Sequence, residues 1–302
     1  MKVALCFLIS YEHILKKEDL WIKWIKENED IINVYFHYKD IKKIKSNWIR
    51  QYSIPPKYIK STTYYNVVPA YMSILSFAFN HDVNNAWFCL LTDSCVPIIS
   101  PKKFRQLFLN HYHLSIIKCR PAYWDISIHR RANLRLLSKE FHLSNDPWFT
   151  LSRFHVRKCV IFLKYKPGIY NQINMGGLAN ESIFAIILQT FDEIKNKDRL
   201  INEHSSIADW SRMSSPTSPY LFKEDIGENI DIITKLLKQN KYTMFLRKVD
   251  KSFPNETLEK LMEMDFNHKY DVLQKKTNFG NTITFFISFF ILLLIAVFYN
   301  YM

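Results

Sequence analysis

His37 and Asp93 are polar side chains that stand at the ends of two apolar stretches of the chain. These stretches have the length and composition of buried strands, and the segments between them have the apolar spacing of helices. The expected strands are residues 3–9, 33–38 and 86–92, and the expected helices are residues 19–28 and 71–80. Because strands that alternate with helices form parallel sheets, whose ligands bind beyond the carboxyl ends of the strands, His37 and Asp93 are expected beside any ligand site.

The rest of the chain contains no internal repeat and continues to alternate between strand and helix patterns. Strands are expected at residues 148–151 and 244–248, helices at residues 152–164, 180–190, 231–239 and 256–264, and loops at residues 167–177 and 205–219. Residues 114–147 are basic and irregular. The order of elements predicts an α/β fold with a mostly parallel central sheet.

Several kinds of binding site are excluded by composition. The chain of 302 residues has five glycines. Their positions match neither the glycine spacing of the dinucleotide-binding fingerprint nor that of the P-loop. No Asp-x-Asp pair is present to hold a divalent metal, and His111 and His113 alone are a weak zinc signal. No metal or cofactor is therefore expected. The cysteines, odd in number and without Cys-x-x-Cys spacing, are typical of a reducing compartment.

The chain is strongly basic, with 41 Lys and Arg against 28 Asp and Glu and a net charge of +13. A charge of this size attracts polyanions such as nucleic acid, an acidic membrane face or a phosphorylated small molecule. A lysine-rich surface that only maintains solubility is an alternative of equal weight, because the lysines are scattered. No nucleic-acid-binding motif accompanies the charge, so we do not expect a nucleic-acid partner.

The C-terminal end has the pattern of a membrane span. No charged residue follows Lys276, and residues 283–299 are almost wholly apolar, the length at which a helix just crosses a bilayer core. Lysines precede this stretch, so the positive-inside tendency predicts a cytosolic N-terminal domain. The expected organisation is a domain of residues 1–269, a basic and polar linker of residues 270–281 and a single-pass C-terminal anchor of residues 282–302.

Six short segments match the motifs of one known family, in the same order along the chain. They are V-Y-F-H at residues 34–37, F-C-L-L-T-D-S-C-V-P-I at residues 88–98, D-P-W-F-T-L-S-R at residues 146–153, N-E-S at residues 180–182, A-D-W-S-R at residues 208–212 and F-L-R-K at residues 245–248. The chain thereby resembles the core-2/I-branching enzymes, glycosyltransferase family 14, which includes protein O-xylosyltransferases and plant relatives. Its low glycine and high lysine content is compatible with a viral member of that family.

The resemblance implies a GT-A-like fold and an inverting, metal-independent transfer of a sugar from a UDP-sugar to an acceptor hydroxyl. Glu181 corresponds to the base that takes the acceptor proton, although a Glu at this place can also complement a helix dipole. Arg212 and Lys248 correspond to the pair that binds the donor diphosphate, and Arg247 replaces Lys248 if the register is shifted by one. As isolated residues, both cations could lie on the solvated surface, although the strand position of Lys248 beside Phe245 disfavours this for Lys248.

Trp148 and Trp210 could offer flat faces to a sugar or a uracil and, with His37 and Asp93, form the expected donor and acceptor pocket. Packing in the core is an equal alternative for Trp148 and the favoured one for Trp210. The sugar expected from the resemblance is N-acetylglucosamine or xylose, transferred to a glycan or a protein hydroxyl. Lys39 and Asn180 depart from the family pattern, which keeps open a catalytically degenerate member that acts as a membrane-tethered binding or scaffold protein.

Overall fold

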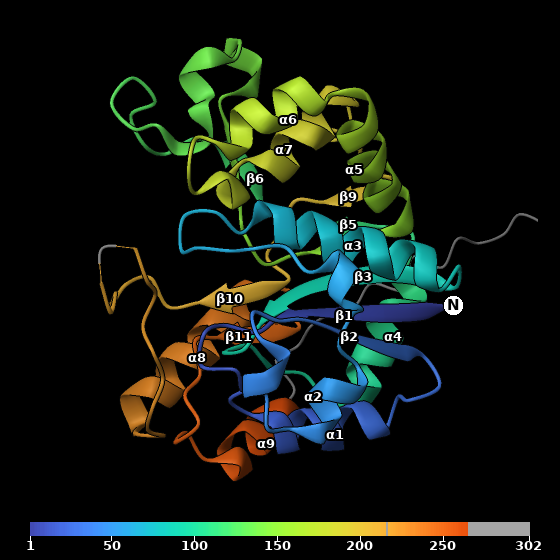
Figure 1. The fold of residues 1–302 in the computed structure, drawn as a ribbon. Coiled ribbons are helices and arrows are strands. Elements are labelled where there is room, and N and C mark those ends of the chain that lie inside the picture. Colours follow the sequence, from blue (N-terminus) through green and yellow to red (C-terminus); the bar gives the residue numbers. More distant parts are fainter. Residues whose placement is uncertain (216, 265–302) are drawn as a thin grey trace, which may run out of the picture. The chain divides into compact units, whose positions relative to one another are not determined.

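Strands β1 (Lys2–Leu8), β2 (Ile32–His37) and β3 (Asn85–Thr92) form the parallel part of a six-stranded central sheet (Figure 1). The computed structural model describes residues 1–215 and 217–264. β1 lies between β2 and β3, and most residues of the three strands are buried, as a parallel sheet covered on both faces requires. The three strands expected in the first third of the chain are confirmed.

The order of the central sheet is β2-β1-β3-β8-β5-β9. Strand β8 (Thr150–Ser152) runs antiparallel to its neighbours β3 and β5 (Ser115–Ile116), whereas β5 and β9 (Leu200–Ile201) are parallel. The sheet is therefore mostly parallel, as expected, with one reversed strand near its middle. That reversed strand carries the chain into the candidate site described below.

Two smaller sheets and a set of helices complete the fold. The smaller sheets are β10-β11-β4 and β6-β7, formed by β4 (Val96–Pro97), β6 (Cys119–Pro121), β7 (Leu143–Asn145), β10 (Ser206–Ala208) and β11 (Phe245–Arg247). The α-helices are α1 (Glu18–Lys26), α2 (Asn47–Gln51), α3 (Val68–His81), α4 (Pro101–His111), α5 (Arg153–Tyr165), α6 (Pro167–Asn174), α7 (Ile183–Thr190), α8 (Gly227–Gln239) and α9 (Asn255–Glu263). Short 3₁₀ helices are Ile41–Lys43, Pro56–Tyr58, Arg131–Leu136, Lys139–Phe141 and Ala179–Glu181.

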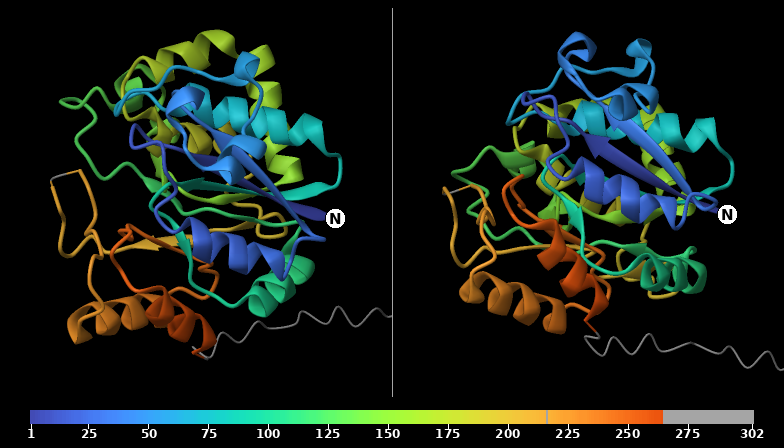
Figure 2. Two further views of the ribbon diagram at one scale, coloured as in Figure 1. Left: turned by 60° about the horizontal axis from the view of Figure 1, so that its bottom comes forward. Right: turned by 90° about the horizontal axis from the view of Figure 1, so that it is seen from below.

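Helices cover the central sheet on both faces (Figures 1 and 2). Helices α3, α5, α6 and α7 lie on one side of the sheet, and α1, α4, α8 and α9 lie on the other. Alternate residues of β1 supply the two faces: Ala4 and Cys6 join the core beneath α3 and α7, whereas Phe7 packs edge-on against Trp21 of α1 at 4.9 Å between ring centroids. Burial of these faces drives the layers together.

Several segments differ from the sequence-based expectation. One is β10 (Ser206–Ala208), which lies within residues 205–219, expected to be a loop. Residues 167–177 were expected to be a loop because of their Pro and Gly, yet most of them form α6. Pro167 occupies the first turn of this helix, where its missing N–H costs no hydrogen bond. Residues 180–190 were expected to be one helix, but a 3₁₀ turn that ends at Glu181 precedes α7. Glu181 therefore lies in the turn that precedes α7 and not in α7 itself.

The expected membrane anchor cannot be compared with the fold. Within residues 1–215 and 217–264, no helix has both the length and the apolar character needed to cross a bilayer. The predicted linker and anchor, residues 270–302, lie outside the described residues, so the anchor stays a prediction. The described residues belong to one compact unit of the chain, Met1–His268. All five cysteines lie in this unit, buried and free, as expected from their spacing.

Two histidines, His37 and His155, are buried in the fold, and burial disfavours their charged form. His37, at the end of β2, is 2% exposed, and its Nε2 accepts a hydrogen bond from the backbone N–H of Lys60 at 3.0 Å. Burial lowers the pKa of His37 from 6.5 to about 4. His155 of α5 is wholly buried, with Nδ1 2.6 Å from Ser115 Oγ, and burial lowers its pKa as well. Both rings are therefore neutral in the folded protein near pH 7.

We expect the free energy of unfolding to fall as the pH falls from 7 to 5. The unfolded chain binds a proton on His37 near pH 6.5, whereas the folded protein binds it only near pH 4, so acid favours the unfolded chain. By linkage, His37 alone accounts for a loss of about 2 kcal/mol over this interval. Urea unfolding at both pH values measures the loss. His37→Gln keeps an acceptor for the Lys60 N–H without a titratable ring, and an equal loss in this variant would contradict the assignment.

Candidate functional site

A cavity of about 510 Å³ lies beside the start of β8, between the β6-β7 pair and β10. Its walls carry two carboxylates, two guanidinium groups and two indole rings, which belong to Asp146, Glu181, Arg120, Arg131, Trp148 and Trp210. Its volume is within the usual range for small-molecule sites. Of the residues expected from the sequence to form a site, Glu181, Trp148 and Trp210 are brought together here.

Glu181 reaches the cavity because the chain turns sharply just before α7. Leu178 has a left-handed φ of 45°, and the 3₁₀ helix Ala179–Glu181 follows it. The side chain of Asn145, at the end of β7, holds this turn: its Nδ2 donates to the Asn180 carbonyl at 2.9 Å. Its Oδ1 accepts two N–H groups in the first turn of α7, at 3.1 and 3.0 Å, which otherwise would lack partners. Asn145 thus positions the turn and caps the helix at once.

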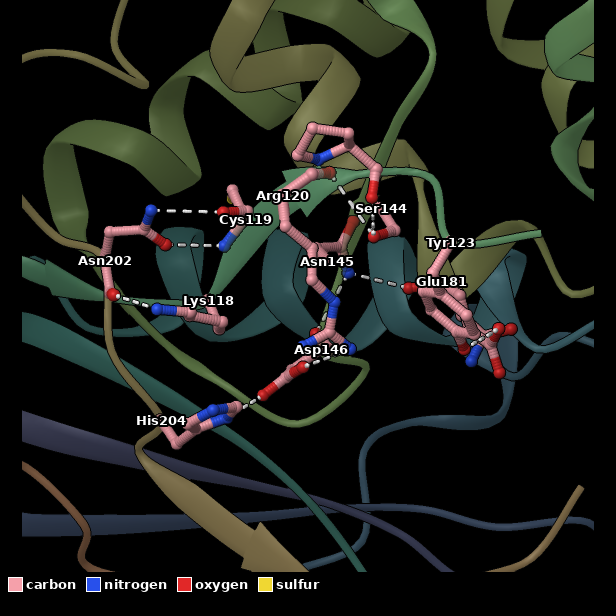
Figure 3. A network of polar contacts seen from close by, with 12 residues as sticks. Lys118, Cys119, Arg120, Tyr123, Ser144, Asn145, Asp146, Glu181, Asn202 and His204 are labelled. Atoms are coloured by element: carbon pink, nitrogen blue, oxygen red, sulfur yellow. Dashed lines mark hydrogen bonds and ion pairs between the residues drawn. The ribbon is translucent and has the colours of Figure 1, made fainter. Parts of the chain in front are cut away.

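The Glu181 carboxylate is set between opposing electrostatic effects. Arg131 Nη1 donates to Oε2 at 3.0 Å. The Tyr123 hydroxyl, which lies beside Glu181 in Figure 3, donates to the same oxygen at 3.4 Å. Burial nevertheless raises the pKa of Glu181, and Asp146 adds to this rise, while Arg131, Tyr123 and Arg120 oppose it. A carboxylate whose pKa is raised accepts a proton more readily. Glu181 is therefore a candidate general base, and it lines the cavity.

Arg131 is held against Glu181 by a tight backbone turn. Ala132 and Asn133 have left-handed φ values of 53° and 49°. Gly176 packs directly on this turn: a Cβ atom at Gly176 would lie 2.1 Å from the backbone N of Asn133. The Ala132 N–H also donates to the Gly177 carbonyl at 2.9 Å. Only a glycine at residue 176 allows this approach.

The second carboxylate of the cavity, Asp146, is paired with His204 and Arg120 (Figure 3). One Asp146 oxygen makes a short hydrogen bond with His204 Nδ1, and the other lies 3.6 Å from Arg120 Nη2. The sequence motif included Asp146 only as its first residue, and His204 was not expected at all. No short-range signal could have joined them, because 58 positions separate them along the chain.

Trp148 lies between the cavity and β11. The Arg247 guanidinium stacks on its ring at 3.4 Å from the centroid, and Arg247 Nη1 donates to Thr92 Oγ1 at 2.8 Å. Trp148 therefore both packs on a buried cation and lines the cavity, so neither alternative for this residue is excluded. Trp210, for which packing was favoured, is 48% exposed and lines the cavity, so that preference was wrong.

Lys248 directly follows β11, and Asp93 directly follows β3. Lys248 Nζ donates to Ser218 Oγ at 3.0 Å. Burial and the neighbouring Arg247 lower the pKa of Lys248 to about 8, against the opposite effect of Asp93. Asp93 is buried, and its Oδ2 accepts the Ser10 backbone N–H at 3.2 Å. Neither residue lines the cavity.

Arg212 is engaged by two carboxylates. Its Nε donates to Asp209 at 2.8 Å, its Nη1 lies 3.1 Å from Glu228, and its guanidinium stacks on Tyr220 at 4.0 Å. The Lys248 backbone N–H donates to the Tyr220 carbonyl at 3.4 Å, so both expected phosphate-binding cations contact one residue. Among the described residues, the buried Arg212 Nη2 has no hydrogen-bond partner.

Four expected site residues do not line the cavity: His37, Asp93, Arg212 and Lys248. The Nε2 of His37 is occupied by the Lys60 N–H. Within the part of the chain that the structure describes, no three His, Cys, Asp or Glu side chains are grouped so that they could hold a metal ion.

Replacing Gly176 by Ala should displace the turn that holds Arg131. The added methyl group would meet backbone atoms of Ala132 and Asn133, so the turn must move. We expect a loss of about 2 kcal/mol in the free energy of unfolding and a further rise in the pKa of Glu181, because Arg131 would no longer lower it. Urea unfolding measures the first effect. Gly168→Ala in α6, whose Cβ would meet nothing within 4 Å, is the matched control and should cost nothing; an equal loss in both variants would refute the role of the turn.

Comparison with known proteins agrees with this architecture. The family model of the Core-2/I-Branching enzyme matches residues 5–232, from β1 to the first half of α8. This span includes Asp93, Trp148, Glu181 and Arg212 and ends before Lys248. No curated protein matches the chain. The mixed α/β architecture with its mostly parallel sheet fits a glycosyltransferase fold. The chain therefore belongs to the core-2/I-branching enzyme family of glycosyltransferases.

Proposed function

We propose that this protein is an inverting glycosyltransferase that moves a sugar, N-acetylglucosamine or xylose, from a UDP-sugar to an acceptor hydroxyl on a glycan or a protein. The placement of Glu181 carries this proposal. Its carboxylate has a raised pKa and stands on the wall of a cavity that also holds the Trp148 and Trp210 rings. A half-buried carboxylate beside flat apolar faces is an arrangement suited to hydroxyl activation on a sugar.

In the proposed reaction, the acceptor oxygen attacks the anomeric carbon of the donor sugar from the face opposite to UDP. The bond between that carbon and the diphosphate oxygen breaks, and its electron pair leaves with UDP. Glu181 takes the proton of the attacking hydroxyl as the new glycosidic bond forms. One displacement of this kind inverts the anomeric configuration, and no covalent enzyme intermediate is needed.

The negative charge that develops on UDP needs fixed cations. Arg247 stacks on Trp148, which lines the cavity, and Lys248 follows Arg247 in the chain. The Arg212 guanidinium and the Lys248 backbone N–H both contact Tyr220. The buried Arg212 Nη2 and Arg247 Nε have no hydrogen-bond partner among the described residues, and a diphosphate would satisfy such donors. These cations support a transfer that does not depend on a metal. Donor binding would draw Arg212 from Asp209 and Glu228.

The proposal includes a membrane tether. Residues 282–302 would anchor the protein by a single C-terminal span, and the lysines that precede the span favour a cytosolic catalytic domain. Acceptors would then be glycans or proteins that are accessible from the cytosol.

A binding or scaffold protein without turnover is a second candidate. The ion pairs that occupy Glu181 and Arg212 favour it, because both groups must exchange partners before they can act. Absence of UDP release from every donor, together with absence of UDP binding, would identify this case.

Replacing Glu181 by Gln should abolish sugar transfer while UDP binding is retained. The amide cannot take the acceptor proton, so turnover should fall by about 10²-fold or more, the usual contribution of a general base. The measurement is UDP release across a panel of UDP-sugars, in EDTA because the proposed reaction needs no metal. Glu29→Gln, at an exposed position, is the control. Turnover like that of the wild type in Glu181→Gln would exclude Glu181 as the base.

The affinity for UDP should fall as the pH rises from 7 to 9. The pKa of Lys248 is about 8, so its ammonium group is mostly charged at pH 7 and mostly neutral at pH 9. Losing this charge beside a diphosphate should weaken binding about tenfold, which calorimetric titration at the two pH values measures. Lys248→Arg remains charged throughout, and its affinity should change little. The same decline in both proteins would remove Lys248 from the donor site.

A further inference from the structure

The Asp146–His204 pair lies in the cavity yet has no part in the chemistry derived above. His204 comes from the segment before β10, and Asp146 from the segment between β7 and β8. Both line the cavity with Glu181, and their side chains are 30% and 15% exposed. The carboxylate and the imidazole are hydrogen-bonded to each other on the cavity wall, so they form a preorganised polar pair (Figure 3).

The bond to Asp146 determines which nitrogen of His204 faces the ligand as an acceptor. An ionised carboxylate only accepts hydrogen bonds, so Nδ1 carries the proton in the neutral ring. Nε2 then has a free lone pair, and within the described part of the chain no hydrogen-bond partner of Nε2 is present. The Asp146 carboxylate is itself occupied, by His204 on one oxygen and by Arg120 at 3.6 Å from the other. Asp146 therefore orients the ring, and Nε2 is the atom available to a ligand.

The Asp146–His204 pair and Glu181 line the same cavity. Asp146 raises the pKa of Glu181, and Arg120 lowers it, which places both groups within electrostatic reach of that carboxylate. The cavity between them has the volume of a small-molecule site, and the rings of Trp148 and Trp210 line it. One ligand in this cavity can thus meet a base, a hydrogen-bond acceptor and an apolar face.

We propose that His204 Nε2, oriented by Asp146, accepts a hydrogen bond from a second hydroxyl of the acceptor, next to the hydroxyl that Glu181 activates. This inference rests on the proposed function and narrows its acceptor to a carbohydrate. A sugar ring presents several hydroxyls and an apolar face, whereas a Ser or Thr side chain presents one hydroxyl. Two hydrogen-bond points on one ring fix its orientation toward the donor. His204 is then a specificity-determining residue, and Asp146 is a positioning residue.

Two substitutions of His204 separate its nitrogens. His204→Asn retains an amide near the position of Nδ1, so the contact with Asp146 can persist while the group at Nε2 is lost. His204→Gln extends to the position of Nε2 and can still accept from a hydroxyl. If Nε2 binds the ligand, His204→Asn should lose affinity for the ligand and His204→Gln should retain it. If the ring only packs, both substitutions should cause the same loss of affinity.

The test is an equilibrium titration of the full chain, saturated with UDP, with methyl glycosides of galactose, N-acetylgalactosamine, N-acetylglucosamine and xylose. Tryptophan fluorescence reports binding, since Trp148 and Trp210 line the cavity. We expect at least one glycoside to bind. His204→Asn should weaken that binding by about three- to tenfold, and His204→Gln should stay close to the wild type. If His204→Asn does not fold, Asp146→Asn replaces it, because an amide that donates to Nδ1 moves the ring proton to Nε2 and should weaken binding equally.

Three results would overturn the inference: no glycoside binds the wild type, His204→Asn binds as the wild type does, or Asn and Gln cause the same loss. Titration of UDP alone in the same samples separates this failure from failure of the proposed function. If UDP binds and no glycoside does, the donor site stands and the carbohydrate acceptor is wrong. If UDP does not bind either, the proposed transferase activity itself is wrong.

Discussion

The reversed direction of β8 within a mostly parallel sheet determines where the candidate site lies. Because β8 runs against β3, with Phe88 opposite Leu151, the chain that leads into β8 emerges at the carboxyl end of β3. Residues 145–148 therefore arrive where Thr92 and Asp93 end that strand. Trp148 can then stack on Arg247, which is bonded to Thr92. A parallel β8 would have carried the same residues to the opposite edge of the sheet.

The cavity that results is balanced in charge rather than simply acidic or basic. Each of its carboxylates lies beside a guanidinium group, Glu181 beside Arg131 and Asp146 beside Arg120. This pairing reduces the free energy required to bury ionised groups. Burial still prevails at Glu181, whose pKa is raised, so the pairing does not remove its basicity. The charged groups of the cavity are thus stabilised by partners from separate elements.

Much of the fold could be predicted because local rules decide it. Continuous apolar runs identified β1, β2 and β3, which are buried on both faces, and helical spacing identified α1, α3, α5 and α9. The prediction failed at two kinds of position. Pro167 begins a helix instead of breaking one, which follows from the local rule that proline is tolerated in the first helical turn. Trp210 is exposed although its ring is large and apolar, and only tertiary context decides this outcome.

By itself, the sequence determined the fold class, the family and the identities of Glu181, Lys248 and Trp148 as candidates, because these follow from motifs and apolar periodicity along the chain. Only the tertiary structure decided which of them share a cavity. It placed His37 away from that cavity, bound Arg212 to two carboxylates and joined His204 to Asp146 across 58 positions. The physical reason is that hydrogen bonds and ion pairs act over a few ångströms in space, and sequence patterns record only neighbours along the chain.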